Sequence, residues 1–362
     1  MKPLLRGIAL LAFLTGCGPE FVDDLPSLED GPESMGVDSS QLTTAQAKGA
    51  ELFFKGTFGG NGRTCATCHS GSDGTIGPAE VQARFQANPK DPLFRSIDSD
   101  DGVGSAYSRL KRDATIRVTL PLPANIALAG SRARTVTVNR GVPTTFNTPA
   151  LDPVLMADGR APTLQAQALD AIHAHAQNKV EPTATQLNQI AAFEKILFTN
   201  SKLALFANGG AAPTLPAGST ASEKRGRAFF NPDGACGQCH TGPMMNIDAF
   251  EGSHFSTAFV SEFNPGNQPL QTFVISTPDG GSFTMEAPDL GRALITGNPN
   301  DIGIYKIPQL WGIKTTAPYF HDNSAKTLQA VVDHYAFAFE IVGFGTLTDQ
   351  DKADIVAYMK LL

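Results

Sequence analysis

The stretches "CATCH" (residues 65–69) and "CGQCH" (residues 236–240) place one Cys-x-x-Cys-His pattern in each half of the 362-residue chain. Four of its five cysteines lie in these two motifs. In a chain that leaves the cytoplasm, this pattern is typical of covalent attachment of c-type haem, with the histidine bound to the iron. The alternatives are a zinc site, a redox dithiol or a disulfide. A zinc site needs four ligands close together, and a redox dithiol does not require the trailing histidine.

The two motifs therefore predict two covalently bound haem c groups. Cys65 and Cys68 would attach the first haem, with His69 as its iron ligand. For the second haem the corresponding residues are Cys236, Cys239 and His240. Two such centres in one molecule can store two electrons.

Residues 1–17 have the pattern of an export signal. Lys2 and Arg6 precede an apolar run, residues 8–14, that is too short to span a bilayer. The segment ends in Leu-Thr-Gly-Cys at Cys17, which favours a bacterial lipoprotein processing site with Cys17 lipidated. The alternative is an ordinary secretory signal with an incidental cysteine. Both predict export, and the first predicts a periplasmic protein anchored by lipid, with the outer membrane favoured over the inner one.

The composition excludes several classes of function. The formal net charge is −7 and 41% of the residues are hydrophobic, as in a soluble globular protein. A negative balance argues against nucleic acid binding and leaves the lipid as the only expected membrane contact. Residues 18–40 contain seven acidic residues and no basic one, which predicts a disordered tether.

The chain also repeats the surroundings of the motif. "KGAELFF" (48–54) and "RGRAFF" (225–230) precede the two motifs, and "IAAFEKIL" (190–197) and "IVAYMKLL" (355–362) end the two halves. These repeated segments predict the same order in each half: a helix, the motif, intervening segments and a closing amphipathic helix. We expect an N-terminal cytochrome c-like domain at 41–207, a linker rich in Gly, Pro and Ala at 208–220, and a C-terminal cytochrome c-like domain at 221–362.

Two inserts predict strands. Residues 115–120 and 135–138 alternate in polarity, and residues 272–276 and 282–286 flank a Pro-Asp-Gly-Gly turn. The expected fold is mainly α, with two cytochrome c-type haem domains and small β-hairpin inserts.

Three segments carry a family resemblance: "RGVPTTFNTPALDPVLMADGRAPTLQAQA" (140–168), "CHTGPMMNIDAF" (239–250) and "YKIPQLWGIKTTAPYFHDNSAKTLQAVVDHY" (305–335). They resemble bacterial di-haem cytochrome c peroxidases and the related MauG enzymes. The resemblance implies that one haem receives electrons from a small donor, a cytochrome c or a cupredoxin, while the other reduces hydrogen peroxide. It also allows a homodimer. The alternatives are a pure electron-transfer protein with both irons six-coordinate and a MauG-like oxidase or oxygenase acting on an organic or protein substrate.

The residues that match the family's peroxide site depart from its pattern. Gln167 matches the distal glutamine, but Gln177 stands where the family has a catalytic glutamate, and an amide cannot move a proton. Ala157 stands where the family has an inter-haem tryptophan. His173 and His175 lie close to the lost glutamate. On a helix starting at 162, His175 shares a face with residues 164, 168 and 172, so it is the first choice for distal acid–base or sixth ligand and His173 the second; a structural histidine is the alternative.

The resemblance implies further ligands in the second half. Tyr335 aligns with the sixth ligand of the second haem, with an ordinary core tyrosine as the alternative and Met285 and His334 as weaker candidates. His321 is expected to bond a haem propionate or to pack. One calcium ion is implied at Thr316 and Pro318, although Gly141 replaces the family's asparagine ligand.

Overall fold

The computed structural model describes residues 31–362. The expected signal, Cys17 and most of the expected tether lie outside the described residues. The tether prediction is wrong for its last residues: Pro32–Met35 and Ser39–Gln41 form 3₁₀ turns, and Met35 is buried against the first-half core. Within the described range, none of the helices combines the length and the apolar character needed to span a membrane.

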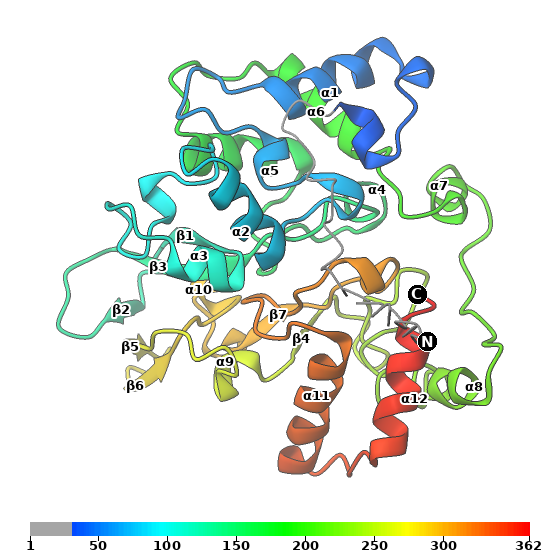
Figure 1. The fold of residues 1–362 in the computed structure, drawn as a ribbon. Coiled ribbons are helices and arrows are strands. Elements are labelled where there is room, and N and C mark those ends of the chain that lie inside the picture. Colours follow the sequence, from blue (N-terminus) through cyan, green and yellow to red (C-terminus); the bar gives the residue numbers. More distant parts are fainter. Residues whose placement is uncertain (1–30) are drawn as a thin grey trace, which may run out of the picture.

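Helices form the two ends of the molecule (Figure 1). The first half contains α1 (Thr44–Lys55), α2 (Pro78–Ala87), α3 (Ser108–Asp113), α4 (Thr148–Leu151), α5 (Leu164–Ala171), α6 (Ala184–Glu194) and α7 (Ser201–Ala207). The second contains α8 (Ala221–Ala228), α9 (Val260–Phe263), α10 (Ala293–Thr296), α11 (Leu328–Val342) and α12 (Asp349–Met359). A π-helical turn, Ile172–Ala176, extends α5.

The repeated sequence segments form helix pairs that pack in the same way in both halves. α1 packs against α6, and α8 packs against α12. A Cβ atom on Gly49 would lie 1.9 Å from the carbonyl oxygen of Gln189, and one on Gly226 would lie 2.0 Å from that of Asp354. Only glycine allows so close an approach of two backbones. The glycine in each segment before the motif is therefore the crossing point of a helix pair.

The same four helices begin in the same way. Each has a threonine N-cap whose hydroxyl accepts from the N3 amide, while the N3 side chain accepts from the threonine amide. This capping box satisfies two amide groups that an α-helix otherwise leaves free. The pairs are Thr43–Gln46, Thr183–Gln186, Thr220–Glu223 and Thr348–Asp351.

Strands lie between the helical ends. β1 (Thr115–Pro121) pairs antiparallel with β3 (Thr135–Gly141), and β5 (Gln271–Ser276) with β6 (Ser282–Ala287), so both expected strand pairs are present. β4 (Phe255–Thr257) pairs with β7 (Ile304–Lys306). A short strand that was not expected, β2 (Ile126–Leu128), joins β5 to give a three-stranded sheet. The fold is thus helical with small sheets, and one sheet contains strands from both halves.

The connection between the halves is irregular. No helix or strand is assigned between residues 209 and 220, and Figure 1 shows this segment running along one side from α7 to α8. The domain limits 41–207 and 221–362 stay a prediction, because the β2–β5 pairing connects the halves through a shared sheet.

Candidate functional site

A single cavity of about 1700 Å³ lies between the two halves. Pockets that hold one small molecule are usually about 300–1,000 Å³, so this space is larger than one ligand needs. Both Cys-x-x-Cys-His motifs line it, through Cys65, Cys68, His69, Cys236, Cys239 and His240. The structure therefore brings the two motifs to one continuous space.

The two motif histidines are held in the same way. His69 Nδ1 lies 3.0 Å from the carbonyl oxygen of Gly74, and His240 Nδ1 lies 2.7 Å from that of Met245, five residues downstream in each case. A carbonyl can only accept, so each Nδ1 carries the proton and Nε2 keeps its lone pair. Metal-binding histidines are usually fixed by such a bond from the other ring nitrogen. Burial also lowers the pKa of both imidazoles, which keeps them neutral.

The four motif cysteines are partly buried and none is in a disulfide. Burial raises the pKa of each thiol above its usual value. Protonated thiols beside an apolar space, each pair followed by an imidazole with a free Nε2, fit covalent haem c. They do not fit zinc, because no cluster of three or more potential metal ligands occurs among residues 31–362.

On the first-half side, the cavity lining contains polar residues near His175. Leu164 and Ala168 are buried along one face of α5, and the π-helical turn places half-buried His175 in the cavity lining. Burial lowers the pKa of His175 to about 4; the charge of Asp98 opposes this shift, and the charges of Arg63, Arg160 and His69 add to it. The α-helix ends at Ala171 and a π-helical turn carries Ile172 and His175, and His175 shares an electrostatic environment with the first motif.

The two arginines near His175 are themselves fixed. Arg63 is buried and its Nη1 donates to Asp98 over 2.6 Å. Arg160 donates to both carboxylate oxygens of buried Asp158, at 3.0 and 2.9 Å. Both arginines line the cavity, so each presents a positively charged group that its ion pair holds in place.

The other expected peroxide-site residues are placed differently. Gln167 lines the cavity. His173 is exposed and its Nε2 lies 2.9 Å from the carboxylate of Glu181. Gln177 is exposed, adopts a left-handed conformation with φ 52°, and accepts from the side-chain amide of Asn61 over 3.0 Å; it is not among the cavity-lining residues. The structure therefore brings His175, Gln167 and the exposed His173 to the cavity lining, whereas Gln177 lies outside it.

The second-half side of the cavity is lined by α11 and α12. Tyr335 lies in the lining, where burial and the nearby Cys239 and Cys236 raise its pKa. The two weaker candidates lie elsewhere: Met285 is on β6, opposite Phe273, and His334 Nε2 lies 2.7 Å from the carbonyl oxygen of Ala258. Neither belongs to the cavity lining.

The helices α5 and α11, which both line the cavity, begin with the same four residues. "TLQA" occurs at 163–166 and again at 327–330, and in each case the threonine is the N-cap, of α5 and of α11. Counting from the cap pairs Gln167 with Val331, Ala171 with Tyr335, and the position of His175 with Phe339. All six line the cavity. Equivalent positions thus carry small and polar side chains in the first half and bulky ones in the second.

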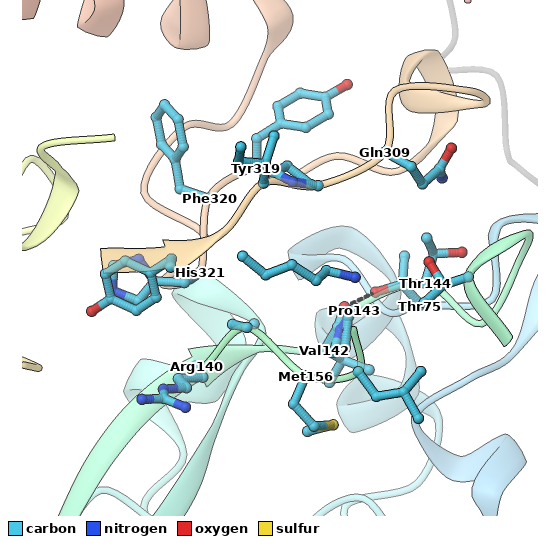
Figure 2. Close-up of a pocket in the computed structure, with 18 of the residues that line it drawn as sticks. Thr75, Arg140, Val142, Pro143, Thr144, Met156, Gln309, Tyr319, Phe320 and His321 are labelled. Carbon is cyan, nitrogen blue, oxygen red and sulfur yellow. Dashed lines mark hydrogen bonds between the residues drawn. The ribbon is translucent and has the colours of Figure 1, made fainter. Parts of the chain in front are cut away.

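A buried polar cluster around Arg140 joins the halves. Arg140 on β3 is 3% exposed; it binds Asp158 of its own half, and its Nε donates to Asp289 of the second half over 2.8 Å. His321 stacks on Tyr305, with ring centroids 3.8 Å apart and planes at 13°. Figure 2 shows Arg140 and Val142 across the pocket from Tyr319, Phe320 and His321. His321 thus lies in the cavity between the halves.

Thr316 and Pro318 also line this cavity. The amide of Gly141 donates to the carbonyl oxygen of His321, and a Cβ atom on Gly141 would lie 2.1 Å from Asn323 Oδ1. Position 141 therefore has no room for the family's asparagine, because the buried side chain of Asn323 fills that space. The residues around Thr316 give no independent support for calcium.

One cavity residue was not anticipated. Glu194 on α6 is 5% exposed, lines the cavity and has no hydrogen-bond partner at Oε2. Burial raises its pKa to about 8. The only signal in the sequence is an acidic residue on the apolar face of "IAAFEKIL".

Similarity to known proteins agrees with these features. The chain is 32% identical over 155 residues to the cytochrome-c peroxidase IdrP1 of Pseudomonas sp. (strain SCT), covering 39% of this chain and 40% of that protein. It is 32% identical over 111 residues to the cytochrome c551 peroxidase of Nitrosomonas europaea, covering 31% of this chain and 26% of that protein. No family model matches the chain.

A solved structure supports the fold. The crystal structure of a MauG-like protein associated with microbial copper homeostasis superposes with a TM-score of 0.51 at 20% identity, covering 90% of both chains. With both motifs on one cavity, these similarities agree with covalently bound haem c. Over about two fifths of its length the chain is similar to bacterial cytochrome c peroxidases, and its fold is similar to that of a MauG-like protein. The chain spans about two fifths or less of the length of the two curated relatives described above.

Proposed function

We propose that the protein is an exported di-haem oxidoreductase that reduces hydrogen peroxide to water with two electrons from a small donor protein. When bound at the two motifs, the haem groups supply two one-electron centres. Peroxide chemistry takes place beside the first motif, and the second motif serves as the electron-receiving centre. A cytochrome c or a cupredoxin is the donor class, and the names of the relatives, which are cytochrome c peroxidases, support a cytochrome.

The observation that carries this assignment is the contrast at equivalent positions of α5 and α11. Ala171 stands where α11 carries Tyr335, so a small side chain faces the cavity in the first half and a potential oxygen ligand in the second. A phenol that binds iron closes the sixth position, whereas alanine leaves room for peroxide. The first-half site is therefore the open one.

His175 is the proton carrier of the first-half site. Reduction of peroxide moves a proton from the near oxygen to the far one as the O–O bond breaks, and general acid–base help is worth roughly 10² to 10⁴ in rate. A neutral imidazole can accept that proton, and the lowered pKa of His175 keeps it neutral at pH 7. Arg160 stabilises the negative charge that develops, because its ion pair with Asp158 holds it in place.

The remaining cavity residues have supporting roles. Gln167 donates or accepts a hydrogen bond but moves no proton, because an amide does not titrate. Gln177 and His173 hold the surface of the loop through Asn61 and Glu181. With haem bound, Tyr335 would be the oxygen ligand of the second iron and His321 would bond a propionate, since both line the cavity. Cys17 carries the lipid that anchors the protein on the periplasmic side of a membrane.

Haem content and iron spin state test the proposal. A pyridine haemochrome assay on denatured protein should give two covalent haems per chain. The electron paramagnetic resonance spectrum of the oxidised or half-reduced protein should then contain a high-spin ferric signal from the first site. Two low-spin signals and no peroxide turnover would instead favour a pure electron-transfer protein. Turnover of an organic or protein substrate without peroxide reduction would favour the MauG-like alternative.

A further inference from the structure

Glu194 is a carboxyl group with no evident structural task. Its side chain is buried in the cavity lining beside the first motif, and one of its oxygens has no partner. Burying a charged carboxylate without a partner lowers the stability of the folded protein. A carboxyl group in such a place is therefore either protonated or has a functional role. Its carboxylate is close enough to Cys65 to raise the pKa of that thiol.

The second half provides a natural comparison. Gly49 contacts Gln189 and Phe193 on α6, and Gly226 contacts Asp354 and Tyr358 on α12 in the same manner. This correspondence aligns the two closing helices residue by residue and pairs Glu194 with Met359. Met359 is also 5% exposed and lines the cavity. The same position beside the motif is therefore occupied by the titratable Glu194 in the first half and by the apolar Met359 in the second.

Among residues 31–362, no other ionisable side chain shifts the pKa of Glu194. The charged residues on α1 and α5, which pack against α6, are exposed: Lys48, Glu51 and Lys55 on α1, and Asp170 on α5, which also borders the cavity. The π-helical turn, whose Ile172 packs with α6, carries His173 and His175. Lys195, the neighbour of Glu194 in the chain, is exposed as well. Cys65 is the titratable group that shares its surroundings, and a thiol bound to haem no longer titrates. Burial alone accounts for the raised pKa of Glu194.

We propose that Glu194 couples the redox state of the first haem to the binding of one proton. When an electron from an external reductant converts ferric to ferrous iron, the site loses one positive charge and the carboxylate takes up one proton from solvent. When the iron is oxidised, the electron leaves and the carboxyl group releases that proton. The inference rests on haem attachment at the first motif, which is one part of the proposed function, and does not require peroxide turnover.

The physical reason is the low dielectric of the cavity. A charge on the iron and a charge on a buried carboxylate interact far more strongly there than in water. The ferric state therefore lowers the pKa of Glu194 and the ferrous state raises it, and linkage requires the reduction potential to fall as pH rises between those two values. Met359 cannot contribute such a dependence to the second haem.

Spectroelectrochemical titration of the full-length di-haem protein, with redox mediators and across pH 5 to 10, tests the proposal. In the wild type, the potential of one haem should fall with rising pH, with uptake of up to about one proton per electron. Glu194→Gln keeps the shape and removes the charge, and Glu194→Met copies the second half. Both variants should flatten that haem's pH dependence and leave the other haem unchanged. Haem content by pyridine haemochrome should stay at two.

The reciprocal substitution protects the test against a variant that fails to fold. Met359→Glu should give the second haem a pH-dependent potential that it lacks in the wild type. The proposal is overturned if Glu194→Gln retains the wild-type pH dependence, or if Met359→Glu leaves the second potential flat. Peroxide turnover of the same samples is measured separately, so a protein without peroxidase activity that passes the titration would refute the proposed reaction and leave the proton coupling intact.

Discussion

The helices α5 and α11 occupy corresponding places in the two halves, yet the side chains that they direct to the cavity differ in polarity and size. α5 and the π-helical turn after it contribute Gln167 and His175, whereas α11 contributes Val331, Tyr335 and Phe339. Both begin at a threonine cap within the same four residues. The caps and the crossing glycines are thus the same in both halves while the cavity-facing side chains differ.

Replacing His175 should have the largest effect. His175→Ala removes the proton carrier and should slow peroxide turnover at least about a hundredfold, with the first haem remaining high-spin. Steady-state kinetics and the electron paramagnetic resonance spectrum measure the two parts. His173→Ala is the matched variant, because this histidine is exposed and bonded to Glu181; its turnover should stay within about twofold.

Three other results would change the role of His175. A low-spin wild type whose His175→Ala variant becomes high-spin and gains peroxide reactivity would make His175 an iron ligand. A variant that changes neither rate nor spectrum would leave it a structural histidine and favour the electron-transfer alternative. A larger loss in His173→Ala than in His175→Ala would exchange their roles.

The crossing glycines should show a similar penalty in both halves. Gly49→Ala and Gly226→Ala each force a Cβ atom against a backbone carbonyl, and overpacking of this kind costs about 3 kcal/mol of unfolding free energy. Urea denaturation followed by circular dichroism measures the loss. Lys55→Ala, at an exposed position of α1, is the control and should change stability by less than about 0.5 kcal/mol. A penalty in one half alone would contradict the packing repeat.

The smallest expected effect is a shift in potential in the second half. An anionic phenolate favours ferric iron, so Tyr335→Phe should raise the reduction potential of the second haem and change its spin state. The first haem should keep its spectrum. An unchanged spectrum of the second haem would show that Tyr335 only packs in the cavity.

The sequence predicted the parts of this molecule that depend on local pattern. The four repeated helices and both strand pairs follow from apolar periodicity and turn residues, and all are present. The buried face of α5 with Leu164 and Ala168 also followed from helical spacing, whereas the π-helical turn that carries His175 did not. These features depend on neighbours within a few turns of chain, where periodicity is informative.

Other features depend on contacts between distant segments. Gln177 lies outside the cavity lining because a left-handed residue ends the π-helical turn, and family alignment does not contain that information. β2 is only three residues long and is stabilised by β5, far away in the chain. Glu194 could have been noted as an acid on an apolar face, but its lack of a partner is visible only when the cavity is closed around it.

The charge cluster at Arg140 bears on how the molecule moves. Its guanidinium binds Asp158 of its own half and Asp289 of the other, and all three side chains are buried. Sliding one half over the other would separate charges in a medium that solvates them poorly, which is strongly unfavourable. Together with the sheet shared by β2 and β5, this clamp favours a single rigid body over a hinged pair. The separation of the two motifs would then be constant, and opening for substrate would have to come from loops rather than from domain rotation.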